Sequence, residues 1–150
     1  RQMCIRDSNG TDSLRVSKDV ACGVVVSMPD YPYSRLTKKE CSGYPLFGLE
    51  HEDLLDCVHA SEIQWGKAPA MVDGEVKEDV PMFVTSGDYV CTVTGTGKTV
   101  EDAKCESYDN IKRYIEIPNS IMYRTDIGCR LEEQLPELRK LGFCKDMRYE

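Results

Sequence analysis

Arg124 and Asp126 are two residues apart in a segment, residues 121–127, whose composition favours a strand. Alternate residues of a strand point to the same side, so the carboxylate of Asp126 can hold the guanidinium of Arg124 in place. A fixed guanidinium with parallel N–H donors suits phosphate and carboxylate groups. The pair is therefore a candidate anion-binding site. The alternative is an ordinary surface ion pair between strand neighbours, which would contribute little.

A glycine-rich segment, residues 95–99, follows a predicted strand and precedes a predicted helix, as a phosphate-binding loop does. That loop needs a further glycine five positions before Gly97, and this chain has Thr92 there. The cradle of backbone amides is then incomplete. We therefore expect a tight turn here, with Thr99 as the N-cap of the helix, rather than a nucleotide site.

The chain has eight cysteines and two histidines, but no C-x-x-C pair and no closely spaced set of zinc ligands. We expect reduced thiols and no metal site. The cysteines are Cys4, Cys22, Cys41, Cys57, Cys91, Cys105, Cys129 and Cys144.

The composition describes an acidic globular chain of 150 residues with a net charge of -7, which disfavours binding to nucleic acid. No apolar run reaches the length that a membrane helix needs, so no membrane partner is expected. We expect a cytoplasmic protein with one domain, residues 19–150. Residues 1–18 are expected to be a disordered or non-native leader.

The elements that must position these residues belong to an α+β fold, with a mainly antiparallel sheet and one or two packed helices. Strands are predicted at residues 21–28, 57–65 and 121–127. Hairpins are predicted at residues 70–78, which contain Asp73-Gly74, and at residues 82–94. A helix with a 3.6-residue apolar period starts at Thr99 and ends before Pro118, and residues 131–141 form a terminal helix interrupted by Pro136.

Four segments in this order resemble the C-terminal domain of phosphoribosylamine-glycine ligase, a family of ATP-grasp enzymes. They are residues 21–27 running into Tyr31-Pro32, Val58-His59-Ala60, residues 84–87 with the strand and helix start that follow, and residues 124–128, Arg-Thr-Asp-Ile-Gly. Each segment alone is a weak signal, whereas their common order across most of the chain is specific.

The resemblance implies the C-terminal domain of an ATP-grasp ligase that joins glycine to 5-phosphoribosylamine with ATP in purine biosynthesis. The family binds ATP and Mg²⁺ mainly in a domain that lies upstream of Asp19. That missing ATP-grasp domain is then the partner of this chain, and the small-molecule substrates are glycine and phosphoribosylamine. We assign no catalytic and no metal-binding residue here, and we expect the fragment alone to be inactive.

The resemblance also implies that this domain forms a wall of the substrate site. The substrate-binding candidates are Arg124, Asp126, Asp30, Tyr31, Pro32, His59, Thr85 and Ser86. The alternatives are a proline-stiffened turn at residues 30–32 and hydrogen-bonding partners within strands for His59, Thr85 and Ser86.

The chain departs from the family pattern at three places. Pro29-Asp30 replaces two glycines, Ser61-Glu62 replaces Gly-Thr, and Asp88 stands where Gly-Arg is usual. These changes leave two other hypotheses open: a diverged carboxylate-amine ligase of different specificity, and a binding module without chemistry.

Overall fold

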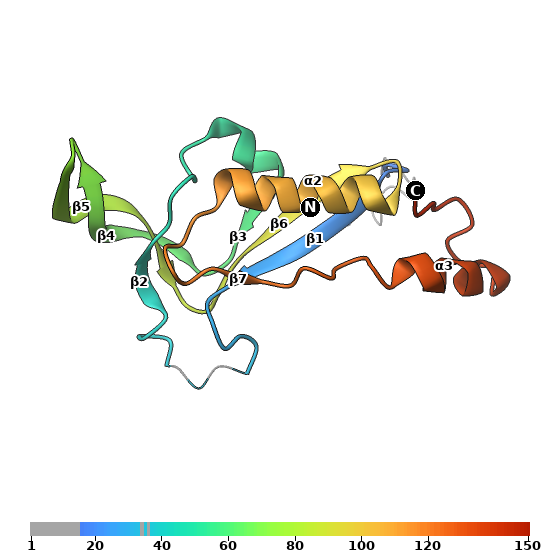
Figure 1. Ribbon diagram of the computed structural model, residues 1–150, viewed down its shortest axis with the longest axis horizontal. Coiled ribbons are helices and arrows are strands. Elements are labelled where there is room, and N and C mark those ends of the chain that lie inside the picture. The colour runs from blue at the N-terminus through green and yellow to red at the C-terminus, as the bar shows by residue number, and fades with distance from the viewer. Residues whose placement is uncertain (1–15, 34, 36) are drawn as a thin grey trace, which may run out of the picture.

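The computed structural model describes residues 16–33, 35 and 37–150, so most of the predicted leader lies outside the described residues. The described chain is α+β, with two antiparallel sheets and two α-helices, which confirms the predicted fold class. Figure 1 shows the elements in order. None of the described helices is long and apolar enough to cross a membrane.

The larger sheet has the strand order β3-β6-β1-β7. Its central pair is β1 (Val20–Ser27) and β6 (Tyr89–Gly97), and its edges are β3 (Val58–Ala60) and β7 (Met122–Tyr123). The predicted strand 121–127 is thus wrong in its length, because only two of these residues pair with β1.

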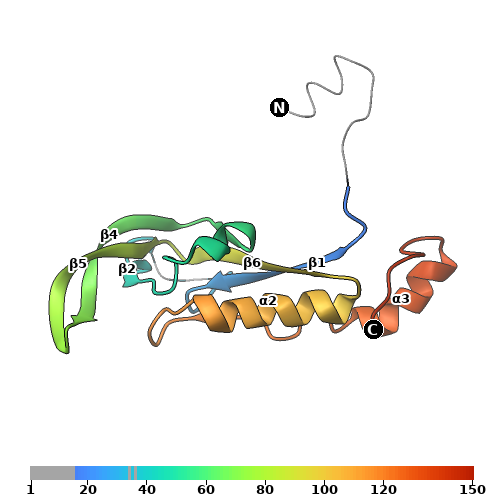
Figure 2. The ribbon, with the colours of Figure 1, turned by 90° about the horizontal axis from the view of Figure 1, so that it is seen from above.

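One face of this sheet is covered by α2 (Val100–Tyr114), which lies along β1 and β6 (Figure 2). Alternation along the strands sends Val24, Val26 and Val93 toward the helix, and all three are fully buried. The helix presents Ala103, Ser107 and Ile111 on one stripe, as the 3.6-residue period predicted. The core of the domain therefore lies between this sheet and α2.

The smaller sheet has the order β2-β5-β4 and extends beyond the main body (Figure 1). Its long hairpin consists of β4 (Ile63–Val72) and β5 (Glu75–Ser86), and β2 (Ser42–Pro45) pairs with β5. The predicted turn at Asp73-Gly74 is confirmed, since both residues have positive φ, as a type I′ turn requires.

Two predicted elements are wrong because the chain changes sheets. Residues 57–65 do not form one strand: β3 pairs with β6, and after Ser61 and Glu62 the chain starts β4 in the other sheet. Residues 82–94 do not form a paired hairpin, because β6 pairs with β1 and β3 rather than with β5. The short 3₁₀ helix η1 (Glu52–Asp56) precedes β3.

The second α-helix, α3 (Leu131–Lys140), runs through Pro136 without the predicted interruption. Proline removes one backbone hydrogen bond, but Leu135 is almost completely buried and holds the helix in place. The residues after α3 return to the start of α2, where the N–H groups of Val100 and Glu101 donate to the carbonyls of Arg148 and Tyr149 at 2.9 Å each. The chain end thus completes the capping of α2.

The described thiols behave as packing groups or surface groups. Cys22, Cys91, Cys105, Cys129 and Cys144 are free thiols. Burial raises the pKa of the Cys91 thiol to about 12, so this side chain is a neutral, apolar group of the core.

Candidate functional site

The face of the larger sheet opposite α2 carries a row of residues from neighbouring strands. His59 on β3 lies opposite Thr92 on β6, and Thr92 lies opposite Val25 on β1. Directly opposed residues of antiparallel strands share a face, so these three side chains lie on the open face. Arg124 follows the last paired residue of β7 and comes next to this row. Three strand spacings place Arg124 about 14 Å from His59.

Two tyrosines form the aromatic part of this open face. The rings of Tyr31 and Tyr89 stack with their centroids 5.8 Å apart, and the hydroxyl of Tyr89 is 2.8 Å from Thr92 Oγ1. The edges of the two stacked rings can contact a flat apolar group of a ligand, and their hydroxyls can form hydrogen bonds with polar groups of that ligand. The open face therefore has an aromatic end beside Tyr31 and a hydroxyl-lined centre.

The turn that carries Tyr31 is fixed against the start of β6. Met28 is buried, and its N–H donates to the carbonyl of Asp88 at 2.8 Å. Asp30 has a positive φ of 75°, which Asp tolerates better than most residues do. As a result Asp30 and Pro32 are exposed, while Tyr31 is half-buried on Tyr89.

Arg124 and Asp126 form the two-bond arrangement that their spacing predicted. Arg124 Nε donates to Asp126 Oδ1 at 2.8 Å, and Nη2 donates to Oδ2 at 2.5 Å. These bonds hold the pKa of Asp126 below its usual range and raise that of Arg124. They use two of the five N–H donors of a guanidinium that is 67% exposed. In the described part of the chain no other hydrogen bond to this guanidinium is found.

Tyr108 of α2 fixes the backbone of the same segment. Its hydroxyl donates to the carbonyl of Arg124 at 2.8 Å and accepts from the N–H of Ile127 at 3.2 Å. The main chain on both sides of Asp126 is therefore tied to the helix. This is the support that a positioned guanidinium needs.

The remaining candidates lie in three different environments. His59 is exposed on the open face, with Nε2 3.1 Å from Thr94 Oγ1. Thr85 is fully buried, and its hydroxyl donates to the carbonyl of Cys41 and accepts from the N–H of Tyr44. Ser86 begins the turn between β5 and β6. The geometry brings His59 to the open face, whereas Thr85 joins two strands of the smaller sheet.

Sequence reasoning missed Tyr89, Thr92 and Gly23. The alternating threonines of β6 were the available signal, because Thr92, Thr94 and Thr96 must share a face beside a predicted strand that contains His59. Gly23 lies opposite Thr94, and because it has no side chain, nothing projects from the sheet at this position. No local pattern could reveal the contact between Tyr31 and Tyr89.

The glycine-rich segment before α2 forms the predicted turn. Thr99 caps the helix by accepting the N–H of Asp102 at 3.1 Å. A Cβ at Gly95 would lie 2.3 Å from the backbone N of Ser107, and a Cβ at Gly97 would lie 2.4 Å from Asp102 Cβ. These glycines allow the close approach of helix and sheet. Within residues 16–33, 35 and 37–150 there is no cluster of His, Cys, Asp and Glu that could hold a metal ion.

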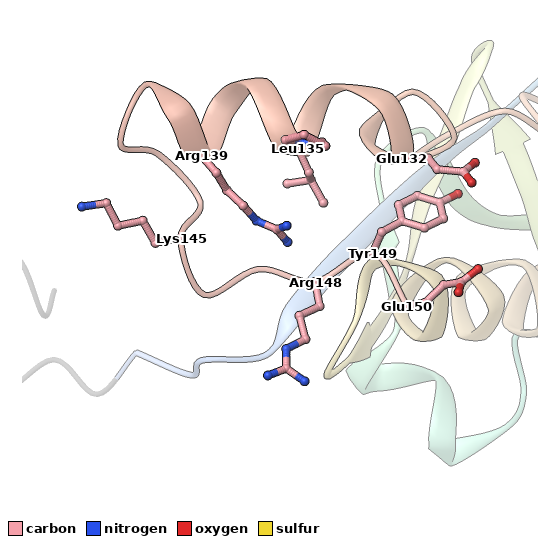
Figure 3. Close-up of a pocket in the computed structure, with 8 residues that line it drawn as sticks. Glu132, Leu135, Arg139, Lys145, Arg148, Tyr149 and Glu150 are labelled. Carbon is pink, nitrogen blue, oxygen red and sulfur yellow. The ribbon is translucent and has the colours of Figure 1, made fainter.

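A pocket of about 510 Å³ lies away from the open face, between α3 and the residues that follow it (Figure 3). Arg139, Lys145 and Arg148 contribute positive charges to its lining, and Glu132 and Glu150 contribute negative ones. Figure 3 shows that the side chains of Arg148 and Lys145 point away from Arg139. The mixed charges favour no single class of ligand.

The family model described as "Phosphoribosylglycinamide synthetase, C domain" matches residues 21–130, which cover the larger sheet, the hairpin and α2. The chain belongs to this family. Membership confirms the resemblance found in the sequence and identifies the domain as the C-terminal part of phosphoribosylamine-glycine ligase, a ligase of purine biosynthesis. No curated protein matches the chain significantly. The matched range of the synthetase C domain includes both ends of the open face, Tyr31 and Arg124.

Proposed function

We propose that the open face of the larger sheet is one wall of the site at which the complete ligase joins glycine to 5-phosphoribosylamine. The match of residues 21–130 to the synthetase C domain carries this proposal. The geometry supports it, because the row from His59 to Arg124 has exposed polar side chains at both ends and is long enough for a phosphorylated sugar. Arg124 would contact the phosphate through the guanidinium N–H groups that are not bonded to Asp126.

ATP and Mg²⁺ belong, in this proposal, to an ATP-grasp domain of the same enzyme. The segment at residues 95–99 does not fit a nucleotide, because its glycines pack against α2 and Thr99 caps that helix. The role of the present domain is then to close the substrate site and to exclude water. The ligase would act in the cytoplasm on small-molecule substrates.

The experiment is a kinetic comparison in the complete ligase that contains this domain. For Arg124→Ala we expect KM for phosphoribosylamine to rise about tenfold, equivalent to the loss of about 1.4 kcal/mol of binding. The melting temperature should not change, because the pair of Arg124 and Asp126 is exposed. Arg113→Ala is the matched control, since Arg113 is a cation in the last turn of α2 and lies over the ring of Tyr114.

Equal effects of the two substitutions on KM, or a fall in stability that accounts for the loss of activity, would contradict this role of Arg124. The 150-residue chain alone should form no glycinamide ribonucleotide from glycine, ATP and phosphoribosylamine. Turnover by this chain alone would refute the assignment of ATP to another domain.

A further inference from the structure

The turn between β5 and β6 surrounds the carboxylate of Glu62 with hydrogen-bond donors. The N–H of Tyr89 donates to Glu62 Oε2 at 3.1 Å, and the backbone of Asp88 makes a smaller contribution to the lowered pKa of this carboxylate. The ammonium of Lys38 lies 2.7 Å from Glu62 Oε1. Backbone amides of a turn, together with a nearby cation, are the usual components of an anion-binding nest. We call this group, together with Gly87, the Gly87 nest.

Gly87 leaves room for the carboxylate in this position. A Cβ at this position would lie 2.0 Å from Oε2 and 2.3 Å from Cδ of Glu62. The carboxylate therefore lies against the Cα of Gly87, and with any other residue at this position it would have to shift. The site is shaped to accept the planar end of a carboxylate.

The side chain of Glu62 can leave the nest without a change in its backbone. The N–H of Glu62 donates to the carbonyl of Tyr89 at 3.1 Å, and its carbonyl accepts from the N–H of Ser86 at 2.8 Å. These bonds fix the main chain between the two sheets independently of the side chain. The Glu62 side chain is 24% exposed and the Lys38 side chain is 72% exposed, so the nest is open to solvent on the lysine side.

The Gly87 nest adjoins the open face. Tyr89 donates its N–H to the nest, while its ring stacks on Tyr31 and its hydroxyl contacts Thr92. Lys38 comes from the connection that follows the turn at Tyr31-Pro32. A ligand that binds in the nest would therefore lie next to the aromatic end of the open face.

We propose that the Gly87 nest is a binding site for a small carboxylate, and that Glu62 is a resident ligand which such a molecule displaces. The nest offers the ammonium of Lys38 to one carboxylate oxygen and the N–H of Tyr89 to the other. The nest already holds the carboxylate of Glu62, so a carboxylate is the group that its observed geometry fits. This proposal goes beyond the ligase function, because it concerns binding by the chain itself, without ATP.

The test uses the 150-residue chain labelled with ¹⁵N, and follows the amide signals of Asp88 and Tyr89 during titration with acetate. If Glu62 occupies the nest for about nine-tenths of the time, Glu62→Ala should bind acetate about tenfold more tightly than the unaltered chain. Adding Lys38→Ala to Glu62→Ala should reverse most of this gain. Glu78→Ala is the matched control, since Glu78 is an exposed acid on β5, and it should bind as the unaltered chain does.

The same spectra show whether each variant is folded. Glu62→Gln replaces Glu62→Ala if the alanine variant has lost its dispersed signals, because the amide keeps the shape and weakens the internal ligand. The proposal is overturned if the two amides do not respond to acetate once Glu62 is removed, or if they respond equally with and without Glu62. A response to inorganic phosphate but not to acetate overturns the carboxylate assignment. None of these results depends on ligase activity, so failure here leaves the proposed function standing.

Discussion

Gly95 on β6 lies directly beneath α2, and the substitution Gly95→Ala should separate the two. The added Cβ would lie 2.3 Å from the N of Ser107 and 2.5 Å from the carbonyl oxygen of Ala103. Both atoms belong to the helix backbone, so no flexible side chain can move away. To restore an ordinary contact of 3.4 Å, the helix must withdraw by about 1 Å along its whole buried stripe.

The expected cost is at the upper end of the range for overpacked cores, about 3 kcal/mol of unfolding free energy. For a chain of this length that corresponds to a fall of about 6–12 °C in Tm. Gly23→Ala is the matched control on the adjacent strand. Its Cβ would lie 3.4 Å from Thr92 Cγ2 and 3.8 Å from Thr94 Cγ2, and both are side-chain methyl groups. We expect Gly23→Ala to change stability by less than about 0.5 kcal/mol.

The assay is urea unfolding followed by far-ultraviolet circular dichroism, which reports chiefly on the helices. Equal midpoints for Gly95→Ala and Gly23→Ala would refute the argument that Gly95 is needed for helix packing. The result also bears on the glycine-rich segment, because a glycine kept only to bind phosphate could be replaced without loss of stability in the absence of nucleotide.

Three further substitutions test individual contacts. Thr99→Ala should lower the unfolding free energy by about 1 kcal/mol in urea titrations, because Asp102 loses its capping acceptor, and Thr99→Ser should not. Thr85→Val should cost about 2 kcal/mol in the same measurement, since one buried and one partly buried backbone group lose their bond to its hydroxyl. Lys38, and secondarily the turn amides, hold the pKa of Glu62 below its usual range, so this carboxylate stabilises the fold above its unfolded pKa of about 4.3. The stability advantage over Glu62→Gln should be constant near pH 7 and vanish as the pH falls through the lowered pKa; an advantage that persists at pH 2 would contradict this.

Features set by neighbouring residues could be predicted from the sequence. The hairpin turn needs two residues with positive φ, and Asp73-Gly74 supplies them locally. The helical period from Val100 to Ile111 is equally local. The ion pair of Arg124 and Asp126 was predicted from their spacing of two residues, although both lie just after the short strand β7.

Features set by distant segments could not be predicted. The alternation of apolar and polar residues in a strand does not identify its partner strand. Nothing in residues 82–94 therefore shows that β6 pairs with β1 rather than with β5. The contacts of Tyr31 with Tyr89 and of Glu62 with the following turn depend on that change of sheet. The sequence shows that Ser61-Glu62 departs from the family pattern. It does not show that the carboxylate of Glu62 contacts Lys38 and Tyr89.

The ends of the described domain meet at one point, the junction between β6 and α2. Asp19, just before β1, forms an ion pair with Lys98, while Arg148 near the chain end accepts the N–H of Val100. Residues 18–20 and 144–147 line a common pocket there. The β4–β5 hairpin lies at the opposite end of the domain (Figure 1), so any polypeptide joined to these two ends would meet the domain at the corner farthest from the hairpin.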